Sequence, residues 1–304
     1  MLSIIVPVYH SKNILPVLCK RISDLQLSFP SLEMIMIDDG SKDGSFETIK
    51  ELSKQYSFIR GFRLSRNFGH QNAVRKALEF TRGDLVAIID DDLQDPPELL
   101  IDFAAKIKEG YDVVYGVRKQ RKGSVFKVFS YFLFYRLLKI LSDIDIPLDT
   151  GDFCMMRSWV AEEMSQMRER RPFLRGLRSW CGGNQIGIEY NRGGRLEGES
   201  GYTLKKLFQI AFDGIFSFSF IPLRLITFLG VLGILFSCFY AVYILGRYMV
   251  VGVEEKGFIS LAFLIMFFGS LNLLSLGMMG EYLSRLYSEQ KRRPFAIVVE
   301  EVSS

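Results

Sequence analysis

Clusters of carboxylates follow two apolar, strand-like segments of this sequence. Three consecutive aspartates occupy residues 90–92, and Asp-Asp-Gly-Ser occupies residues 38–41. The Asp-Asp-Gly-Ser segment alone is as often a tight turn with a helix N-cap as a binding loop. The three adjacent aspartates are stronger evidence for a bound cation, because clustered carboxylates repel one another unless a cation compensates them. Mg²⁺ and Mn²⁺ prefer oxygen ligands and take one or two protein carboxylates together with substrate phosphates.

The composition argues against other kinds of site. The chain has 304 residues with only 2 His and 4 Cys, which excludes a His-rich metal site and supports neither a zinc ribbon nor a disulfide framework. Neither a GxxxxGKS/T loop nor a GxGxxG loop is present, so a P-loop NTPase and a dinucleotide dehydrogenase are disfavoured. The first ten residues lack the pattern of a signal peptide, which predicts a cytoplasmic amino-terminal part. What remains is a nucleoside diphosphate held through a metal ion.

The elements that must position these carboxylates alternate between strand-like and helix-like patterns up to about residue 116. This alternation predicts an α/β fold with a mostly parallel sheet and helices on both faces. Ligands of such sheets bind beyond the carboxyl ends of the strands, where both carboxylate clusters occur. The expected strands are 2–8, 33–37, 58–64, 85–89 and 113–115, and the expected helices are 14–25, 45–55, 71–81 and 97–108.

Two long stretches without charged residues follow Arg224. Residues 225–245 and 258–280 are 21 and 23 residues long, and about 20 apolar residues cross a bilayer core. They predict a two-helix transmembrane hairpin; buried core helices, the alternative, are usually shorter and carry a polar stripe. Cations are denser outside the hairpin than in the loop 246–257, so the positive-inside bias predicts cytoplasmic termini and an external loop.

A basic, aromatic segment precedes the hairpin. Residues 113–142 hold seven cations and no acid, and residues 125–141 are rich in Phe, Tyr and Leu. Lys127, Tyr131, Tyr135 and Lys139 share one helical arc, although Arg136 lies outside it. The pattern predicts a helix in the membrane interface, with a core helix as the alternative. Apolar helical spacing beside spans favours lipid over nucleic acid as the partner.

These patterns together predict how the chain is divided. The expected parts are a cytoplasmic α/β domain over 1–202 with an interfacial segment over 118–142, a juxtamembrane amphipathic helix over 203–224, transmembrane helices over 225–245 and 258–280, an external loop over 246–257, and a cytoplasmic tail over 281–304.

Eight segments in order along the chain resemble glycosyltransferase family 2 enzymes of the GT-A (Rossmann-like) fold. The nearer likeness is to the polyprenyl-phosphate glycosyltransferase branch, which includes bactoprenol glucosyltransferases and dolichol-phosphate mannose synthases. Each segment is moderately specific, but the ordered set followed by two spans is highly specific. The segments are IIVPVY (4–9), IDDGSKDGS (37–45), LSRNFGHQNA (64–73), IIDDDLQDPPE (88–98), DTGDFCMM (149–156), FLRGLRSW (173–180), GIFSFSFIPLR (214–224) and GEYLSRLY (280–287).

The resemblance implies roles for individual residues of the nucleotide and metal site. Pro7 and Tyr9 would border the nucleotide base, and Asp39 would hydrogen-bond the base edge. Asp90 and Asp92 take the outer positions of the Asp-x-Asp motif that holds Mg²⁺ or Mn²⁺, with Asp92 as the more direct ligand. The intervening aspartate, Asp91, would also belong to the nucleotide site.

The resemblance implies further roles beside the donor sugar. Gln94 and Asp95 would face the donor sugar or the acceptor phosphate, and Asp152 stands where such enzymes place a candidate catalytic base. The remaining two residues of interest, His70 and Gln71, are expected only to begin a helix. The candidates for gripping phosphate are Arg118, Arg175, Arg178 and Arg195.

The sequence departs from this branch at two places. Residues 10–12 read His-Ser-Lys where relatives often have Asn-Glu-Glu, which affects the base pocket. Residues 200–202 read Ser-Gly-Tyr where relatives have Ser-Lys-Tyr, so one phosphate-facing cation of the branch is missing.

The resemblance implies an activity and a location. The activity would be inverting transfer of a sugar from a nucleoside diphosphate sugar, UDP-glucose or a related UDP-sugar, to polyprenyl (undecaprenyl) phosphate at the inner membrane. The product would serve cell-envelope glycan modification, and a homo-oligomer, a tetramer, is implied. One alternative is a processive polysaccharide synthase, but its Gln-x-x-Arg-Trp motif and additional spans are missing. The other, a non-catalytic membrane scaffold, fits poorly with the full carboxylate set.

Overall fold

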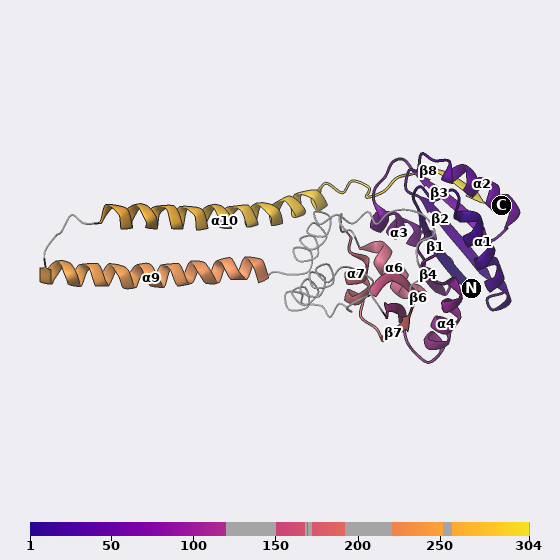
Figure 1. The fold of residues 1–304 in the computed structure, drawn as a ribbon, viewed down its shortest axis with the longest axis horizontal. Coiled ribbons are helices and arrows are strands. Elements are labelled where there is room, and N and C mark those ends of the chain that lie inside the picture. Colours follow the sequence, from indigo (N-terminus) through magenta and orange to yellow (C-terminus); the bar gives the residue numbers. More distant parts are fainter. Residues whose placement is uncertain (120–149, 168, 170–171, 192–220, 252–256, 304) are drawn as a thin grey trace. The chain divides into compact units, whose positions relative to one another are not determined.

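The computed structural model describes residues 1–119, 150–167, 169, 172–191, 221–251 and 257–303 (Figure 1). The chain forms two compact units. The larger unit combines the residues up to 211 with residues 293–304, and the smaller unit lies within residues 212–292. The expected interfacial segment 118–142 and juxtamembrane helix 203–224 fall outside the described residues except at their ends, and so does Arg195.

The larger unit is built on a sheet of eight described strands in the order β7-β5-β6-β4-β1-β2-β3-β8. Its centre is parallel, as expected, while β6 runs antiparallel to both β4 and β5, and β8 runs antiparallel to β3. The parallel centre gathers the carboxyl ends of four strands at one edge. The strands are β1 (Leu2–Val8), β2 (Leu32–Asp38), β3 (Ile59–Leu64), β4 (Leu85–Ile88), β5 (Val113–Arg118), β6 (Thr150–Arg157), β7 (Gln185–Tyr190) and β8 (Val298–Ser303).

Helices cover both faces of this sheet. On one face α1 (Leu15–Asp24), α2 (Ser45–Gln55) and α4 (Leu100–Lys108) bury the main apolar core, and on the other lie α3 (His70–Leu78), α6 (Ser158–Gln166) and α7 (Leu174–Trp180). Strand β6 illustrates the division, because successive side chains point to opposite faces. Phe153 packs against Phe103 of α4, while the preceding Asp152 contacts α3 and α7.

The expected strands and helices of the first 116 residues are confirmed with small shifts of their ends. The region expected as helix 97–108 begins with a short 3-10 turn, η2 (Pro97–Leu99), before α4, and α1 is followed by η1 (Leu25–Leu27). Strands β6, β7 and β8 were not expected. Apolar residues in β7 and β8 are interrupted by Gly187 and by Glu300 and Glu301, and the apolar run of β6 covers only residues 153–156. Their strand conformation comes from pairing with the existing sheet.

The residues expected as a cytoplasmic tail, 281–304, contain two described elements, and their location stays a prediction. Helix α10 (Phe258–Gln290) continues ten residues past the expected end of the second span, and Val298–Ser303 then forms β8 on the edge of the sheet. The pairing is possible because Gly61 of β3 has no side chain: a Cβ there would overlap Ile49 and lie 2.8 Å from Val302. Strand β8 therefore covers what would otherwise be an open sheet edge.

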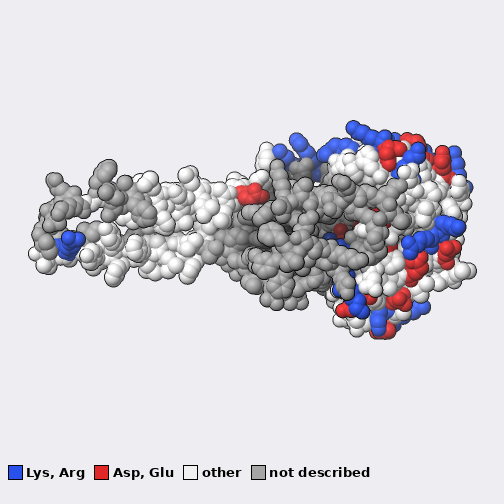
Figure 2. Space-filling view, viewed as in Figure 1, with Lys and Arg blue, Asp and Glu red and all other residues white. Residues whose placement is uncertain are grey.

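The smaller unit consists of α9 (Ile221–Val251) and α10, which contact each other. Its described surface is almost uncharged in Figure 2, and large apolar side chains such as Phe239 and Val242 are exposed. One described stretch, Leu264–Gln290, is long and apolar enough to cross a membrane, while Ile226–Tyr240 in α9 is shorter. Helix α9 also extends to Val251, so the expected loop 246–257 begins later than predicted. The two-span hairpin stays a prediction.

Adding volume at Gly61 should detach β8 from β3. We expect Gly61→Val to lower the free energy of unfolding by about 1–3 kcal/mol, because the new side chain must displace Ile49 or Val302. Thermal unfolding of the purified full chain measures the change. The matched control is Val299→Ile, which adds a methylene at an exposed position of β8. An unfolding temperature for Gly61→Val equal to that of the control would contradict this packing.

Candidate active site

Two aspartates join the loops at the carboxyl edge of the sheet. Asp91, after β4, accepts hydrogen bonds from the Tyr9 amide (3.2 Å) and the Ser11 hydroxyl, both in the loop after β1. Asp39, after β2, accepts hydrogen bonds from the amides of Phe68 (2.7 Å) and Gly69 (2.9 Å) in the loop after β3. The loops of four parallel strands are thereby fixed in pairs.

These contacts show where the residues expected at the nucleotide base lie. Tyr9 is exposed beside its neighbour His10, whereas the Pro7 ring is buried within β1. Burial raises the pKa of Asp39, although its two backbone hydrogen bonds oppose the shift. Asp39 and Asp91 thus connect neighbouring loops by hydrogen bonds. Their expected contacts with the nucleotide stay predictions.

The aspartate-rich loop after β4 has a constrained backbone. The Asp92 carboxylate accepts a hydrogen bond from the Gln94 amide (3.1 Å), and Leu93 between them has a left-handed φ of 54°. Such a conformation is uncommon for a branched residue and occurs mostly where the surrounding structure enforces it. Asp95 is buried and accepts a hydrogen bond from the Tyr190 hydroxyl, which attaches the loop to the end of β7.

Asp90 is partly buried among the other carboxylates of the site. Burial raises its pKa to about 6, and the charges of Asp95, Asp152 and Asp92 add to the effect while His70 opposes it. No group of three His, Cys, Asp or Glu side chains among the described residues is already arranged to hold a metal. Asp90 and Asp92 nevertheless fit Mg²⁺ or Mn²⁺, which need few protein carboxylates when substrate phosphates complete the shell.

Asp152 of β6 is held by two helices at once. Its carboxylate accepts hydrogen bonds from Gln71 Nε2 of α3 (2.8 Å) and Arg175 Nε of α7 (3.0 Å). His70 Nε2, also on α3, lies 3.4 Å from the same carboxylate and 3.7 Å from Asp90. Burial alone would raise the pKa of Asp152, but Arg175 and His70 outweigh it and hold the pKa well below its usual range. Asp152 is therefore ionised and a weak base.

His70 and Gln71 are functional candidates that sequence reasoning missed. Desolvation opposes the protonated form of His70, yet its contacts with Asp152 and Asp90 raise its pKa to about 9. The available signal was their position: they begin the helix after β3, whose carboxyl end lies at the same edge as those of β1, β2 and β4. A polar pair at that position belongs to the site by topology.

The structure separates the expected phosphate-binding arginines. Arg175 contacts Asp152. Arg118 lies next to Gly151 instead: a Cβ on Gly151 would come within 2.8 Å of Arg118 Nη2, and it would point to the opposite face of β6 from Asp152. Arg178 is 2% exposed, and its guanidinium lies 4.8 Å from the Tyr115 ring. The described arginines are therefore separated: Arg175 contacts Asp152, and Arg178 is enclosed between α7 and the sheet.

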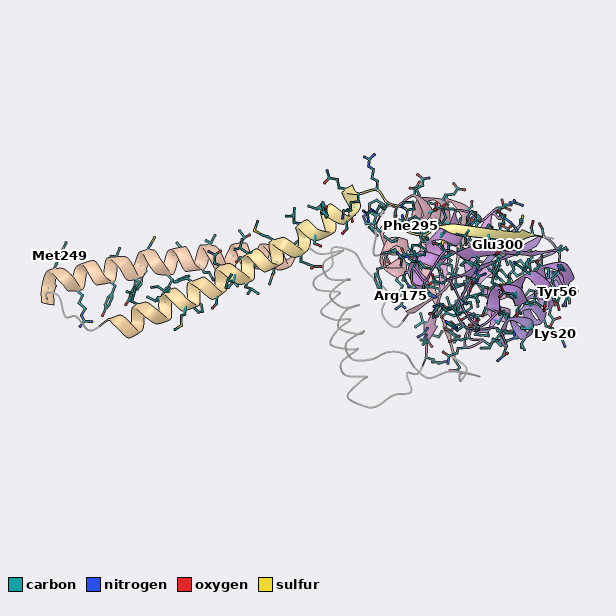
Figure 3. All side chains as sticks on the ribbon, turned by 90° about the horizontal axis from the view of Figure 1, so that it is seen from above. Lys20, Tyr56, Arg175, Met249, Phe295 and Glu300 are labelled. Carbon is teal, nitrogen blue, oxygen red and sulfur yellow. The ribbon has the colours of Figure 1, made fainter. Side chains whose placement is uncertain are left out.

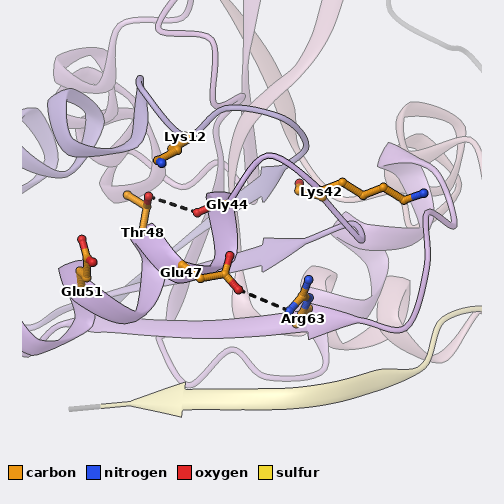
Figure 4. Close-up of a pocket in the computed structure, with 8 residues that line it drawn as sticks. Lys12, Lys42, Gly44, Glu47, Thr48, Glu51 and Arg63 are labelled. Atoms are coloured by element: carbon orange, nitrogen blue, oxygen red, sulfur yellow. Dashed lines mark hydrogen bonds and ion pairs between the residues drawn. The ribbon is translucent and has the colours of Figure 1, made fainter.

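A pocket of about 420 Å³ lies beside the loop after β2 (Figure 4). Three of its lining side chains are cationic, and Arg63 is 3.7 Å from Glu47. None of the aspartates of the loop after β4 lines it, so this pocket is adjacent to the carboxylate cluster and distinct from it. The lining residues are Lys12, Ser41, Lys42, Gly44, Glu47, Thr48, Glu51 and Arg63.

Comparison with known proteins identifies the family. Residues 3–165 match the sequence profile of glycosyl transferase family 2. The chain is 41% identical over 298 residues to the uncharacterized glycosyltransferase YkcC of Bacillus subtilis (strain 168), covering 97% of this chain and 92% of the relative. It is 34% identical over 302 residues to the bactoprenol glucosyl transferase of Shigella phage SfV, covering 99% and 98%.

Solved structures are more distant. Staphylococcal TarS 1-349 (S. aureus) in complex with UDP-GlcNAc is 17% identical, with a TM-score of 0.47 and coverage of 71% of this chain and 65% of that one. The family assignment depends instead on the profile, which spans more than half of the chain, and on the nearly full-length relatives. On this evidence the chain belongs to glycosyltransferase family 2, and it is a glycosyltransferase with a GT-A-like α/β fold.

Proposed function

We propose that this chain transfers a sugar, with inversion, from a nucleoside diphosphate sugar to polyprenyl phosphate on the cytoplasmic face of a membrane. The expected donor is UDP-glucose or a related UDP-sugar, and the glycolipid product would supply cell-envelope glycan modification. One observation carries the proposal: Asp152, held by Arg175, His70 and Gln71, lies beside the carboxylates after β4 in a chain that aligns over 99% of its length with a bactoprenol glucosyl transferase.

The donor side of the reaction depends on charge. The raised pKa of Asp90 reflects burial among like charges, which a divalent cation bound by Asp92 and Asp90 would relieve. When bound, Mg²⁺ or Mn²⁺ would neutralise the leaving diphosphate. The chain's own contribution is a loop fixed by the Gln94 amide and by Tyr190, so that the two carboxylates are oriented before the donor arrives.

The acceptor side does not require a strong base. A phosphate monoester has a second pKa of about 6, so polyprenyl phosphate is largely ionised at neutral pH. The low pKa of Asp152 makes it a poor proton acceptor, and its contacts with Arg175 and His70 suit it to hold these cations. We infer that Asp152 positions Arg175 for the acceptor phosphate, while a phosphate contact by Arg118 stays a prediction.

The apolar helices α9 and α10 provide the route to a lipid acceptor. Exposed apolar side chains on α9 and α10, and the stretch Leu264–Gln290, support membrane insertion. Two spans, cytoplasmic termini, the interfacial segment 118–142 and a homo-oligomer belong to the same proposal. A processive synthase and a non-catalytic scaffold remain the competing functions, and the experiments below separate them.

A substrate panel tests the reaction and its stereochemistry. Purified full chain with Mn²⁺ and undecaprenyl phosphate should convert one of a set of labelled nucleotide sugars into a glycolipid carrying a single sugar. NMR of that product should show the anomeric configuration opposite to that of the donor, because one in-line attack inverts the carbon. Polymeric product would favour the processive synthase, and retention would reject the single displacement.

Asp92→Asn should separate an enzyme from a scaffold. We expect kcat to fall roughly 100-fold or more, because one charge that stabilises the leaving diphosphate is lost. Metal-dependent binding of the donor, measured by calorimetry, should weaken as well. The control is Asp102→Asn, which removes an exposed carboxylate on α4. Equal donor binding and turnover in both variants would favour the scaffold.

Asp152→Asn should separate a positioning role from a base. We expect kcat to fall roughly 100-fold, because Arg175 and His70 lose the carboxylate that places them. The residual activity should keep the wild-type shape of the pH profile, since no titrating base has been removed. Loss of the acidic limb of the profile in the variant would instead identify Asp152 as the base.

A further inference from the structure

A buried arginine on α3 joins that helix to the end of the chain. Arg75 is 1% exposed, and its guanidinium lies 3.9 Å from the centre of the Phe295 ring. Arg75 also donates a hydrogen bond to the carbonyl oxygen of Glu169, in the connection between α6 and α7. A buried guanidinium needs such partners, and an aromatic face stabilises it most when both are desolvated.

Phe295 belongs to a segment that we call the C-terminal strap, residues 293–303. The strap follows α10 directly and ends as β8 (Figure 3, where Phe295 and Glu300 mark it). The Ile297 carbonyl accepts a hydrogen bond from the Ser65 amide (2.9 Å), and Ala296 is buried. The strap is thereby fixed to β3, to the loop after β3, and through Phe295 to α3.

The first turn of α3 contacts Asp152. Gln71 donates through Nε2 to Asp152 (2.8 Å) and accepts through Oε1 from the Leu174 amide (2.8 Å), which begins α7. Both halves of its amide are engaged, so Gln71 sets the distance between α3, β6 and the helix that carries Arg175. Gln71 and Arg75 are four residues apart and lie on one face of α3, one turn from each other.

We propose that Phe295 is a positioning residue of the transfer reaction: the C-terminal strap, through Arg75 and α3, sets the positions of Gln71 and Asp152. This inference rests on the proposed function, in which Asp152 places Arg175 for the acceptor phosphate. The physical reason is that a helix of nine residues moves as a rigid body, so loss of the contact at Arg75 shifts both Gln71 hydrogen bonds. Displacement of about 1 Å at a reacting centre can cost roughly 100-fold in rate.

Phe295→Leu tests the inference on the full chain, with undecaprenyl phosphate and the nucleotide sugar that the wild type turns over. Leu keeps most of the apolar volume but offers no aromatic face to Arg75. We expect kcat to fall roughly 10- to 100-fold with unchanged KM for both substrates and unchanged donor-binding stoichiometry. Phe295→Trp should keep kcat near the wild-type value, because Trp offers Arg75 an aromatic face. Ile297→Ala, in the same strap with an exposed side chain, should behave as wild type.

A double-mutant cycle identifies the path. If the strap acts through Gln71, the kcat losses of Phe295→Leu and Gln71→Met should be far from additive, since the second substitution breaks contacts that the first has already displaced. Additive losses would overturn the inference. Arg75→Met should reproduce the loss of Phe295→Leu, and it covers the case in which Phe295→Leu folds poorly.

The two proposals fail in different ways. Wild-type kcat in both Phe295→Leu and Arg75→Met, with only a lower melting temperature, would reduce the strap to a stabilising element and leave the proposed function standing. Absence of glycolipid formation by the wild type itself would reject the proposed function, and this inference with it.

Discussion

Compensation of negative charge around Asp152 is the constraint on which the rest of the site depends. Its carboxylate is largely removed from water and lies near Asp90, so it stays ionised only because Arg175 and His70 supply positive charge. These cations come from different helices on the same face of the sheet. The packing of α3 and α7 on β6 therefore also stabilises the charge of the site. Because both helices contact the same carboxylate, a shift of one helix changes the environment of Asp152 for the other.

The aspartates after β2 and β4 share a residue type but differ in their physical roles. The carboxylates of Asp39 and Asp91 accept hydrogen bonds from neighbouring loops, and the buried Asp95 accepts one from Tyr190. Asp90, near His70, and Asp92, bonded by the Gln94 amide, are the carboxylates expected to hold the metal ion. The loops are thus rigid before a ligand binds, and the strained backbone at Leu93 belongs to that rigidity. Preorganised charge of this kind needs little rearrangement during a reaction.

Sequence patterns predicted the parallel half of the sheet well, because β1, β2 and β4 are mostly apolar and almost fully buried. They could not predict β8, whose pairing depends on the missing side chain of Gly61 more than two hundred residues earlier. Motifs located Asp90, Asp92 and Asp152, whereas Gln71 was read as an ordinary helix residue, since its importance lies in contacts with residues 81 and 103 positions away. The burial of Arg178 against Tyr115 could not be read from its motif either, and its expected phosphate contact stays a prediction.

The position of β8 at the end of the chain has a consequence for biosynthesis. A ribosome delivers the first 211 residues of the larger unit, then both long helices, and only afterwards the strand that completes the sheet. The outer edge of β3 therefore stays without a partner strand while α9 and α10 are made, and Arg75 lacks its contact with Phe295 during that time. The sheet of the larger unit can therefore be completed only after α9 and α10 have left the ribosome. The order of synthesis makes the pairing of β8 with β3 the last step in forming this fold.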